Sequence, residues 1–460
     1  MTRTTRFKLL PLALLLAAAP MLAGAEDLMD AYRDARANDP QLAQADAARM
    51  FNNEFPKQAW GALLPQINAS YGFTDSHGSS TSAQPFIDSN GALQVQSFRS
   101  STSGRNTTLQ GELTQTLFDW SKFAQVKVGK AQAAGGEAQY QAALQSLMLR
   151  TAQAYFNVLT AIDTLTFAQA EEKALARQLE QAQQRFEVGL SAITDVNEAK
   201  AQHDSAVANV IDAQNALDDA REALTQITGK PAGELKRLRE DLPLNPPQPN
   251  NLTEWVDTAL KQNPALLAQQ FQVEADQHSV NVARSAHLPT LNASVVYTRT
   301  PSWSDQTFGG LTSHINSERS DTAVGLVLSV PIFSGGITQS RVRQAIYQRD
   351  QASDLLEQDR RQVVRNTRNA FRSVIAGVSE VEARKQAVIS AQSALDATRA
   401  GFEVGTRTIV DVLISQQNLF QAQSNYSQAR HAFVINQLAL KQSAGTIDVK
   451  DIEAVNALLQ

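Results

Sequence analysis

Two copies of one turn sequence decide the fold: residues 401–411 read GFEVGTRTIVD and residues 185–195 read RFEVGLSAITD. The two copies align without a gap at a constant offset of 216 positions. Each copy contains a glycine, Gly189 or Gly405, which can adopt the positive φ of a turn between two helices. The sequence therefore predicts a tandem duplication with one helical hairpin in each half.

Long helices are predicted on both sides of each turn. Residues 121–186 and 336–402 contain no proline and are rich in Ala and Gln, so each predicts a rod of about 100 Å at about 1.5 Å per residue. In the returning helix of each half, apolar or small residues recur at spacings of three and four, which is typical of a coiled-coil seam. The seam positions of the first half are Val196, Ala199, His203, Ala206, Val210, Ala213, Leu217, Ala220, Leu224 and Ile227.

Each half also contains two predicted strands with one apolar and one polar face. LPQINASYGFT starts at residue 64 and LPTLNASVVYT at residue 288, and apolar side chains occupy alternate positions in both. A second alternating segment follows each of these strands. The residues between the strands, 75–106 and 301–320, are rich in Ser, Gly and Asn, so we expect them to be long polar loops.

The domain boundaries follow the duplication. A basic start, an apolar stretch and a small-residue cleavage site predict a signal peptide at residues 1–25. The first repeat is then 26–229 and the second 252–445, each expected to contain a proline-broken helix, two strands and a long helical hairpin. A Pro-rich linker, 230–251, joins the repeats, and a short tail, 446–460, follows them.

Composition argues against several classes of function. The net charge is −5 and no basic patch occurs, so nucleic acid is not an expected partner. The chain contains no cysteine, which removes disulfides and thiolate nucleophiles. No phosphate loop, dinucleotide fingerprint or nucleophile elbow is found, and no two histidines have the spacing of a helical metal pair. We therefore expect no enzyme, no metal site and no cofactor.

Two carboxylates at the turns are the remaining candidates for a site. Asp195 lies in a D-x-x-E pattern and Asp411 in a T-x-x-D pattern, so each is explained as an ordinary residue at or near a helix N-terminus. The functional interpretation is a ring of charge around the axis of a symmetric oligomer. Oligomerisation is expected because four strands are too few for a membrane barrel, whose minimum is about eight.

With these features the chain resembles the TolC family of outer-membrane export channels. The resemblance rests on GTRTIVDVL at 405–413, VGLSAITDV at 188–196, AYFNVLTAIDTL at 154–165 and the LPxxNAS strand starts, and it covers nearly all of the mature chain. It implies a mainly α protein with a membrane β-barrel. Three chains would form a twelve-stranded barrel in the outer membrane of a Gram-negative bacterium, above a long periplasmic α-helical barrel with an equatorial belt of linker and tail.

The resemblance also implies partners and a gate. Such channels carry proteins or small toxic compounds in type I secretion and multidrug efflux. They work with a periplasmic membrane-fusion adaptor and an inner-membrane ABC or proton-driven RND-type transporter. Asp411 matches the aspartate that rings the closed periplasmic tip, while Arg407, Thr194 and Asp195 match members of the bonds that hold the tip shut.

Two gate positions depart from the family pattern. Ile414 stands where the family has a second aspartate, and Phe402 stands where it has a tyrosine, so one closing hydrogen bond cannot form here. The alternative function is a periplasmic coiled-coil adaptor or scaffold. Such a protein would share the long hairpins but lack membrane-type strands, so cellular location distinguishes the two.

Overall fold

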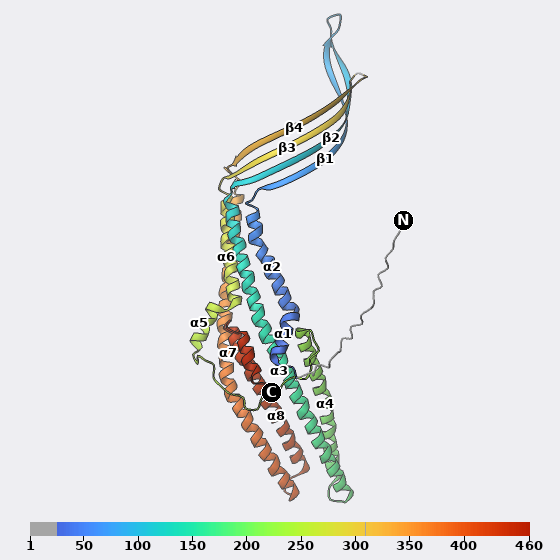
Figure 1. Cartoon of the computed structure of the whole chain (residues 1–460). Helices are drawn as coiled ribbons and strands as arrows, with labels where there is room; N and C mark the ends of the chain where they lie inside the picture. Colours follow the sequence, from blue (N-terminus) through green and yellow to red (C-terminus); the bar gives the residue numbers. More distant parts are fainter. Residues whose placement is uncertain (1–24, 309) are drawn as a thin grey trace, which may run out of the picture. The chain divides into compact units, whose positions relative to one another are not determined.

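The computed structural model describes residues 25–308 and 310–460. The predicted signal peptide, apart from Ala25, lies outside these residues. The helices are α1 (Leu28–Asn38), α2 (Pro40–Gly61), α3 (Trp120–Glu187), α4 (Ile193–Thr228), α5 (Leu252–Gln262), α6 (Pro264–Ser285), α7 (Ile337–Glu403), α8 (Ile409–Ser443) and α9 (Val449–Asn456). The strands are β1 (Gln66–Ile87), β2 (Leu93–Phe118), β3 (Thr290–Phe308) and β4 (Leu311–Ser329) (Figure 1).

The chain divides into two compact units, and each combines segments from both halves of the duplication. Unit 1 contains the described residues up to 43, together with 143–259 and 365–460. Unit 2 contains residues 44–142 and 260–364, and therefore the whole sheet. Among the described residues, no helix combines the length and the apolar character needed to span a membrane.

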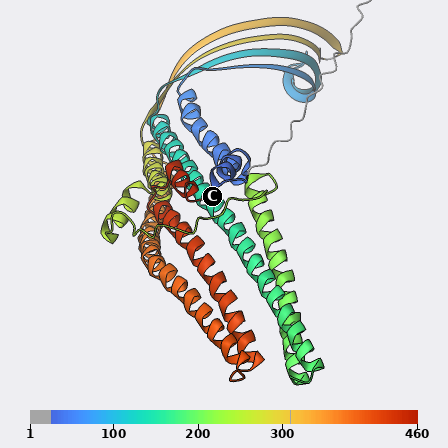
Figure 2. The same cartoon turned by 60° about the horizontal axis from the view of Figure 1, so that its bottom comes forward.

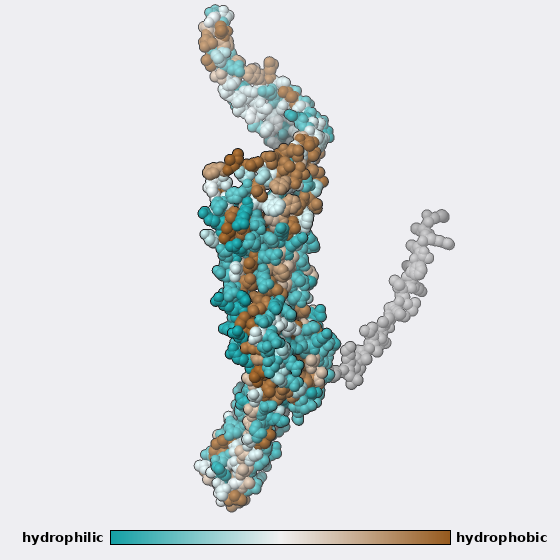
Figure 3. Space-filling view, turned by 90° about the vertical axis from the view of Figure 1, so that its left-hand side faces the viewer, coloured by the Kyte–Doolittle hydropathy of each residue, from teal (hydrophilic) through white to brown (hydrophobic). Residues whose placement is uncertain are grey.

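The sheet of unit 2 confirms the predicted strands. It is antiparallel in the order β1-β2-β3-β4. Its register aligns one apolar row across all four strands, in which Ile67 faces Leu113, Leu113 faces Val295 and Val295 faces Val324. Hydrophobic side chains gather where the sheet meets the helices of unit 2 (Figure 3).

The two long polar loops predicted between the strands are wrong. β1 continues to Ile87 and β2 begins at Leu93, while β3 continues to Phe308 and β4 begins at Leu311. Polar residues extend the strands because they pair across them. The hydroxyls of Ser302 and Ser317 share a hydrogen bond of 2.7 Å, and those of Thr307 and Thr312 share one of 2.9 Å. The Ser-, Gly- and Asn-rich composition does not distinguish these strands from loops, because the sequence of one strand does not show its cross-strand partners.

Unit 1 contains the ends of two helical hairpins, α3–α4 and α7–α8, which the turned view separates clearly (Figure 2). The predicted seam of α4 is confirmed, since its positions are buried or half-buried from Val196 to Ile227. His203 lies on this seam and approaches Glu172 of α3 at 3.4 Å. The seam therefore joins the two helices of one hairpin.

The linker and the tail lie side by side in unit 1. The backbone N–H of Arg237 donates to the Gln460 carbonyl at 3.0 Å, and the Gln460 N–H returns a bond of 2.9 Å. The hydroxyl of the buried Tyr155 approaches the carbonyls of Glu26 and Lys236 at 3.1 and 2.9 Å. Burial raises the pKa of Tyr155, so the hydroxyl stays protonated and remains a hydrogen-bond donor.

Candidate functional site

The first hairpin turn, between α3 and α4, has the geometry of a Schellman motif. Gly189 has a φ of 76°, which no non-glycine residue adopts anywhere in the described chain. The N–H of Leu190 donates to the Arg185 carbonyl at 2.7 Å, and the N–H of Gly189 donates to the Phe186 carbonyl at 2.9 Å. These two bonds satisfy carbonyls at the end of α3 that have no partner within the helix.

The second turn, between α7 and α8, repeats this geometry. Gly405 has a φ of 79°, and its N–H donates to the Phe402 carbonyl at 3.1 Å. The N–H of Thr406 donates to the Gly401 carbonyl at 2.8 Å. Gly401 also leaves room for the side chain of Arg407, because a Cβ at position 401 would lie only 2.8 Å from the Arg407 Cγ. The predicted turn glycines, Gly189 and Gly405, are thereby confirmed.

Asp411 completes a capping box at the start of α8. The N–H and the hydroxyl of Thr408 both donate to Oδ2 of Asp411 at 2.9 Å, and the Asp411 N–H donates to the Thr408 hydroxyl at 3.3 Å. The hydrogen bonds from Thr408, with a smaller contribution from Arg407, hold the pKa of Asp411 below its usual value. The T-x-x-D interpretation is confirmed, and the carboxylate stays ionised at neutral pH.

Asp195 plays a different part at the start of α4. The N-cap residue is Ala192, which supplies no side-chain hydrogen bond, and Thr194 is exposed in the first turn. Asp195 lies three residues after this N-cap, so the D-x-x-E pattern of Asp195 and Glu198 does not cap the helix. The position near a helix start was predicted correctly, but the capping role was wrong because α4 begins before Asp195.

A small cavity of about 80 Å³ brings Asp195 and Phe402 together at the hairpin tips. Arg185 also lines it, and its guanidinium carbon lies 4.9 Å from the centroid of the Phe402 ring. Arg185 is not singled out by the sequence analysis. The available signal was the mismatch inside the repeat, because the position matching Arg185 in the second copy is Gly401.

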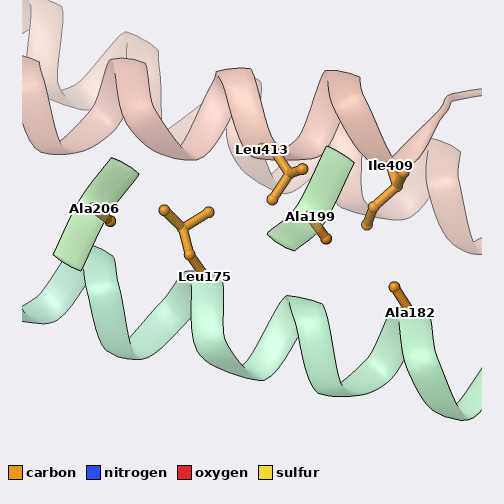
Figure 4. Packing of buried hydrophobic residues seen from close by; sticks show 6 residues of the cluster. All are labelled: Leu175, Ala182, Ala199, Ala206, Ile409 and Leu413. Atoms are coloured by element: carbon orange, nitrogen blue, oxygen red, sulfur yellow. The ribbon is translucent and has the colours of Figure 1, made fainter. Parts of the chain in front are cut away.

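Hydrophobic packing joins the two hairpins beside this cavity. One cluster combines residues of α3, α4 and α8 (Figure 4), namely Leu175, Ala182, Ala199, Ala206, Ile409 and Leu413. Phe402 packs against this cluster and also against a second one formed by Leu395, Val412 and Leu419. The Phe402 ring is therefore held between the two hairpins of one chain.

The remaining gate predictions are not tested by a single chain. Among the described residues, no hydrogen bond or ion pair within the chain joins Arg407 to Thr194 or Asp195, so that link stays a prediction. Ile414 is half exposed near the start of α8. No group of three or more His, Asp or Glu side chains in the described ranges is arranged to hold a metal ion.

Comparison with known proteins identifies the family. The family model described as "Outer membrane efflux protein" matches residues 31–230 and 255–446. "Outer membrane protein TolC" of Escherichia coli (strain K12) is 40% identical over 458 residues, which cover 98% of this chain and 89% of that protein. "Alkaline protease secretion protein AprF" of Pseudomonas aeruginosa is 29% identical, over 94% of this chain and 86% of its own length.

A solved structure shares the fold. The Campylobacter jejuni CmeC outer membrane channel superposes with a TM-score of 0.73 at 16% identity, over 95% of this chain and 90% of that one. The resemblance found in the turn sequences is thus confirmed. The chain belongs to the outer membrane efflux protein family, whose members are channels and not enzymes.

Proposed function

We propose that this protein is a trimeric outer-membrane channel that carries proteins, small toxic compounds or both from an inner-membrane pump across the periplasm and the outer membrane. Type I secretion and multidrug efflux are the two processes it would serve. The secretion protein named for alkaline protease, 29% identical, supports the first of these. The observation that carries the proposal is a sheet whose apolar face is exposed, in the same chain as two long hairpins.

The sheet needs further strands to close. β1 and β4 are its two edges, and each is paired on one side only. Long unpaired edges favour association with another chain because they present a row of free N–H and C=O groups. Pairing β1 of one chain with β4 of the next would close a barrel, and three chains would contribute twelve strands. This arrangement supports the trimer.

The two faces of the sheet suit lipid and water. Val295, Val324 and Ile67 lie in one exposed apolar row, which would face lipid. Asn292 lies three residues from Val295 and therefore on the opposite face, where its Oδ1 accepts a hydrogen bond from the Thr116 hydroxyl at 3.1 Å. That polar face would line a water-filled lumen.

The experiment compares arginine at two positions of β3. Val295→Arg should reduce membrane insertion by about 2–4 kcal/mol if the site lies near the midplane of the bilayer, whereas Asn292→Arg should have a milder effect. The readout is the amount of folded protein extracted from the outer membrane, with a detergent-corrected mass of three chains. Equal damage at both positions, or a folded, active protein with the mass of one chain, would contradict the proposal.

We further propose that the hairpin tips form the periplasmic gate. Asp411 from three chains would meet near the axis, and Arg407 would bond to Thr194 or Asp195 to hold the tip closed. The two repeats, 26–229 and 252–445, would supply equivalent hairpins, while the linker and tail would form an equatorial belt. A periplasmic membrane-fusion adaptor and an ABC or RND-type transporter are the proposed partners of the trimer.

A further inference from the structure

One charged contact joins the tips of the two hairpins. The guanidinium of Arg185, in the last turn of α3, lies over the ring of Phe402, in the last turn of α7, with 4.9 Å between Cζ and the ring centroid. A guanidinium within about 6 Å of an aromatic centroid is attracted by the negative face of the ring. The contact therefore links α3–α4 to α7–α8 within one chain.

Both partners are held in place by their surroundings. The Arg185 carbonyl accepts the turn bond from Leu190, which fixes the backbone where the side chain begins. The Phe402 ring packs against one apolar cluster that combines residues of α3, α4 and α8, and against a second cluster formed by Leu395, Val412 and Leu419. The ring and the backbone of Arg185 are thus held in place, and the Arg185 side chain is the group that must still be ordered to make the contact.

This contact lies close to the tip, far from the other side-chain hydrogen bonds between the two hairpins. The next side-chain hydrogen bonds between the two hairpins, among the described residues of unit 1, join Thr160 to His431 and Ser427 to Asp163. Asp163 precedes Arg185 by 22 positions, which is about 33 Å along a helix. Without Arg185, apolar packing would be the remaining contact between the described residues of the two hairpins over about the last 30 Å.

The contact is not repeated at the matching positions of the duplication. The residue that matches Arg185 in the second copy is Gly401, and the residue that matches Phe402 in the first copy is Phe186. Because Gly401 has no side chain, the reciprocal contact from α7 to Phe186 cannot form. Among the described residues of the two tips, the contact of Arg185 with Phe402 therefore has no counterpart running from the second hairpin to the first.

We propose that Arg185 is a positioning residue that holds the α7–α8 tip against the α3–α4 tip of the same chain through the ring of Phe402, and so resists opening of the gate. This inference rests on the proposed channel function. A movement that carries α7–α8 away from α3–α4 breaks the contact between Arg185 and Phe402. The whole free energy of this contact therefore opposes opening. Removing it shifts the opening equilibrium of each chain by about two- to fivefold.

A double-mutant cycle tests the coupling. Arg185→Met keeps the length of the side chain and removes its charge, and Phe402→Leu keeps apolar packing and removes the ring. Single-channel recordings of the full-length trimer should show higher conductance or open probability for Arg185→Met. The same substitution should have no added effect in the Phe402→Leu background, and Arg185→Lys should restore part of the closure. Arg177→Met is the matched control, because the Arg177 Nε donates to the backbone carbonyl of Lys173 in its own helix at 3.2 Å.

A distance measurement separates failure of this inference from failure of the channel proposal. Spin labels at the exposed positions Glu187 and Glu403, one on each hairpin, report the separation of the tips in detergent, whether or not the protein conducts. Arg185→Met should lengthen and broaden the shortest distance, and Arg177→Met should not. If no variant conducts but Arg185→Met lengthens the distance between the labels, the positioning role of Arg185 is supported and the channel proposal is wrong. If Arg185→Met leaves this distance unchanged, or has the same effect in the parent chain and in Phe402→Leu, the positioning role of Arg185 is wrong.

Discussion

The two hairpin turns have the same backbone conformation but differ in how the following helix begins. Gly189 and Gly405 have φ values of 76° and 79°, and both turns close with the same pair of hydrogen bonds. α8 then begins with a capping box on Thr408, whereas the N-cap residue of α4, Ala192, supplies no side-chain hydrogen bond. The duplicated sequence thus keeps what the backbone requires and lets the polar side chains take separate roles.

Because of this difference, the two aspartates have different contacts. Asp411 accepts both bonds from Thr408 and remains ionised, so it can be a cap and a fixed negative charge together. Asp195 occupies the same third helical position but has no hydroxyl to pair with, and it lines the cavity beside Arg185 and Phe402. Asp411 therefore places a fixed charge at the α7–α8 tip, whereas Asp195 lines the cavity beside the contact between the tips.

The largest expected effect comes from the feature that the two turns share. Gly189→Ala and Gly405→Ala should each destabilise the end of the preceding helix by about 1–2 kcal/mol, because an L residue resists the left-handed region. No atom lies within 4 Å of the added Cβ at either position, so the two costs should be equal. Amide hydrogen exchange in the last turns of α3 and α7 measures them. Gly233→Ala, at an ordinary φ with equal space, is the control, and unequal costs would show that the turns are not equivalent.

Exchanging the caps should reverse the difference between the turns. Thr408→Ala should destabilise the start of α8 by about 1 kcal/mol. Ala192→Thr should stabilise the start of α4 by up to about 1 kcal/mol, because Asp195 stands where Asp411 does in the capping box. Hydrogen exchange in the first turns of α4 and α8 is the measurement. No gain at α4 would mean that Asp195 cannot leave its cavity.

The smallest expected effect is a pH dependence confined to the second turn. Because the folded pKa of Asp411 is depressed, its contribution is fully present above the unfolded value near 3.8 and is lost as the pH falls through the folded pKa. The difference in α8 stability between the parent and Asp411→Ala should therefore be largest at neutral pH and shrink below pH 3.8. Exchange rates or thermal melts across this range test it, and a difference that grows in acid would have the wrong sign.

Periodic features could be predicted from the sequence, whereas contacts across the duplication could not. The helices, the seam and the alternating faces of β1 and β3 follow from local spacing, which one segment contains in full. The polar extensions of the strands were missed because their stability depends on pairs such as Ser302 with Ser317. The turn glycines and the Thr408 cap were visible, because each is a local pattern.

The contact between Arg185 and Phe402 could not be predicted in the same way. Its partners lie 217 positions apart on different helices, and only the packing of two hairpins brings them together. The same limit applies to Arg407, whose proposed partners Thr194 and Asp195 belong to the other hairpin. Side chains that act between elements depend on the tertiary arrangement, which spacing along one helix does not contain.

The block of single channels by a trivalent cation tests the central claim, that Asp411 forms a ring of charge in a trimeric channel. Three carboxylates near one axis attract a multivalent cation strongly, and the depressed pKa keeps them ionised at neutral pH. With the cation on the periplasmic side, the parent channel should be blocked and the Asp411→Ala channel should conduct without block. Equal block of both channels would show that Asp411 serves only as the cap of α8.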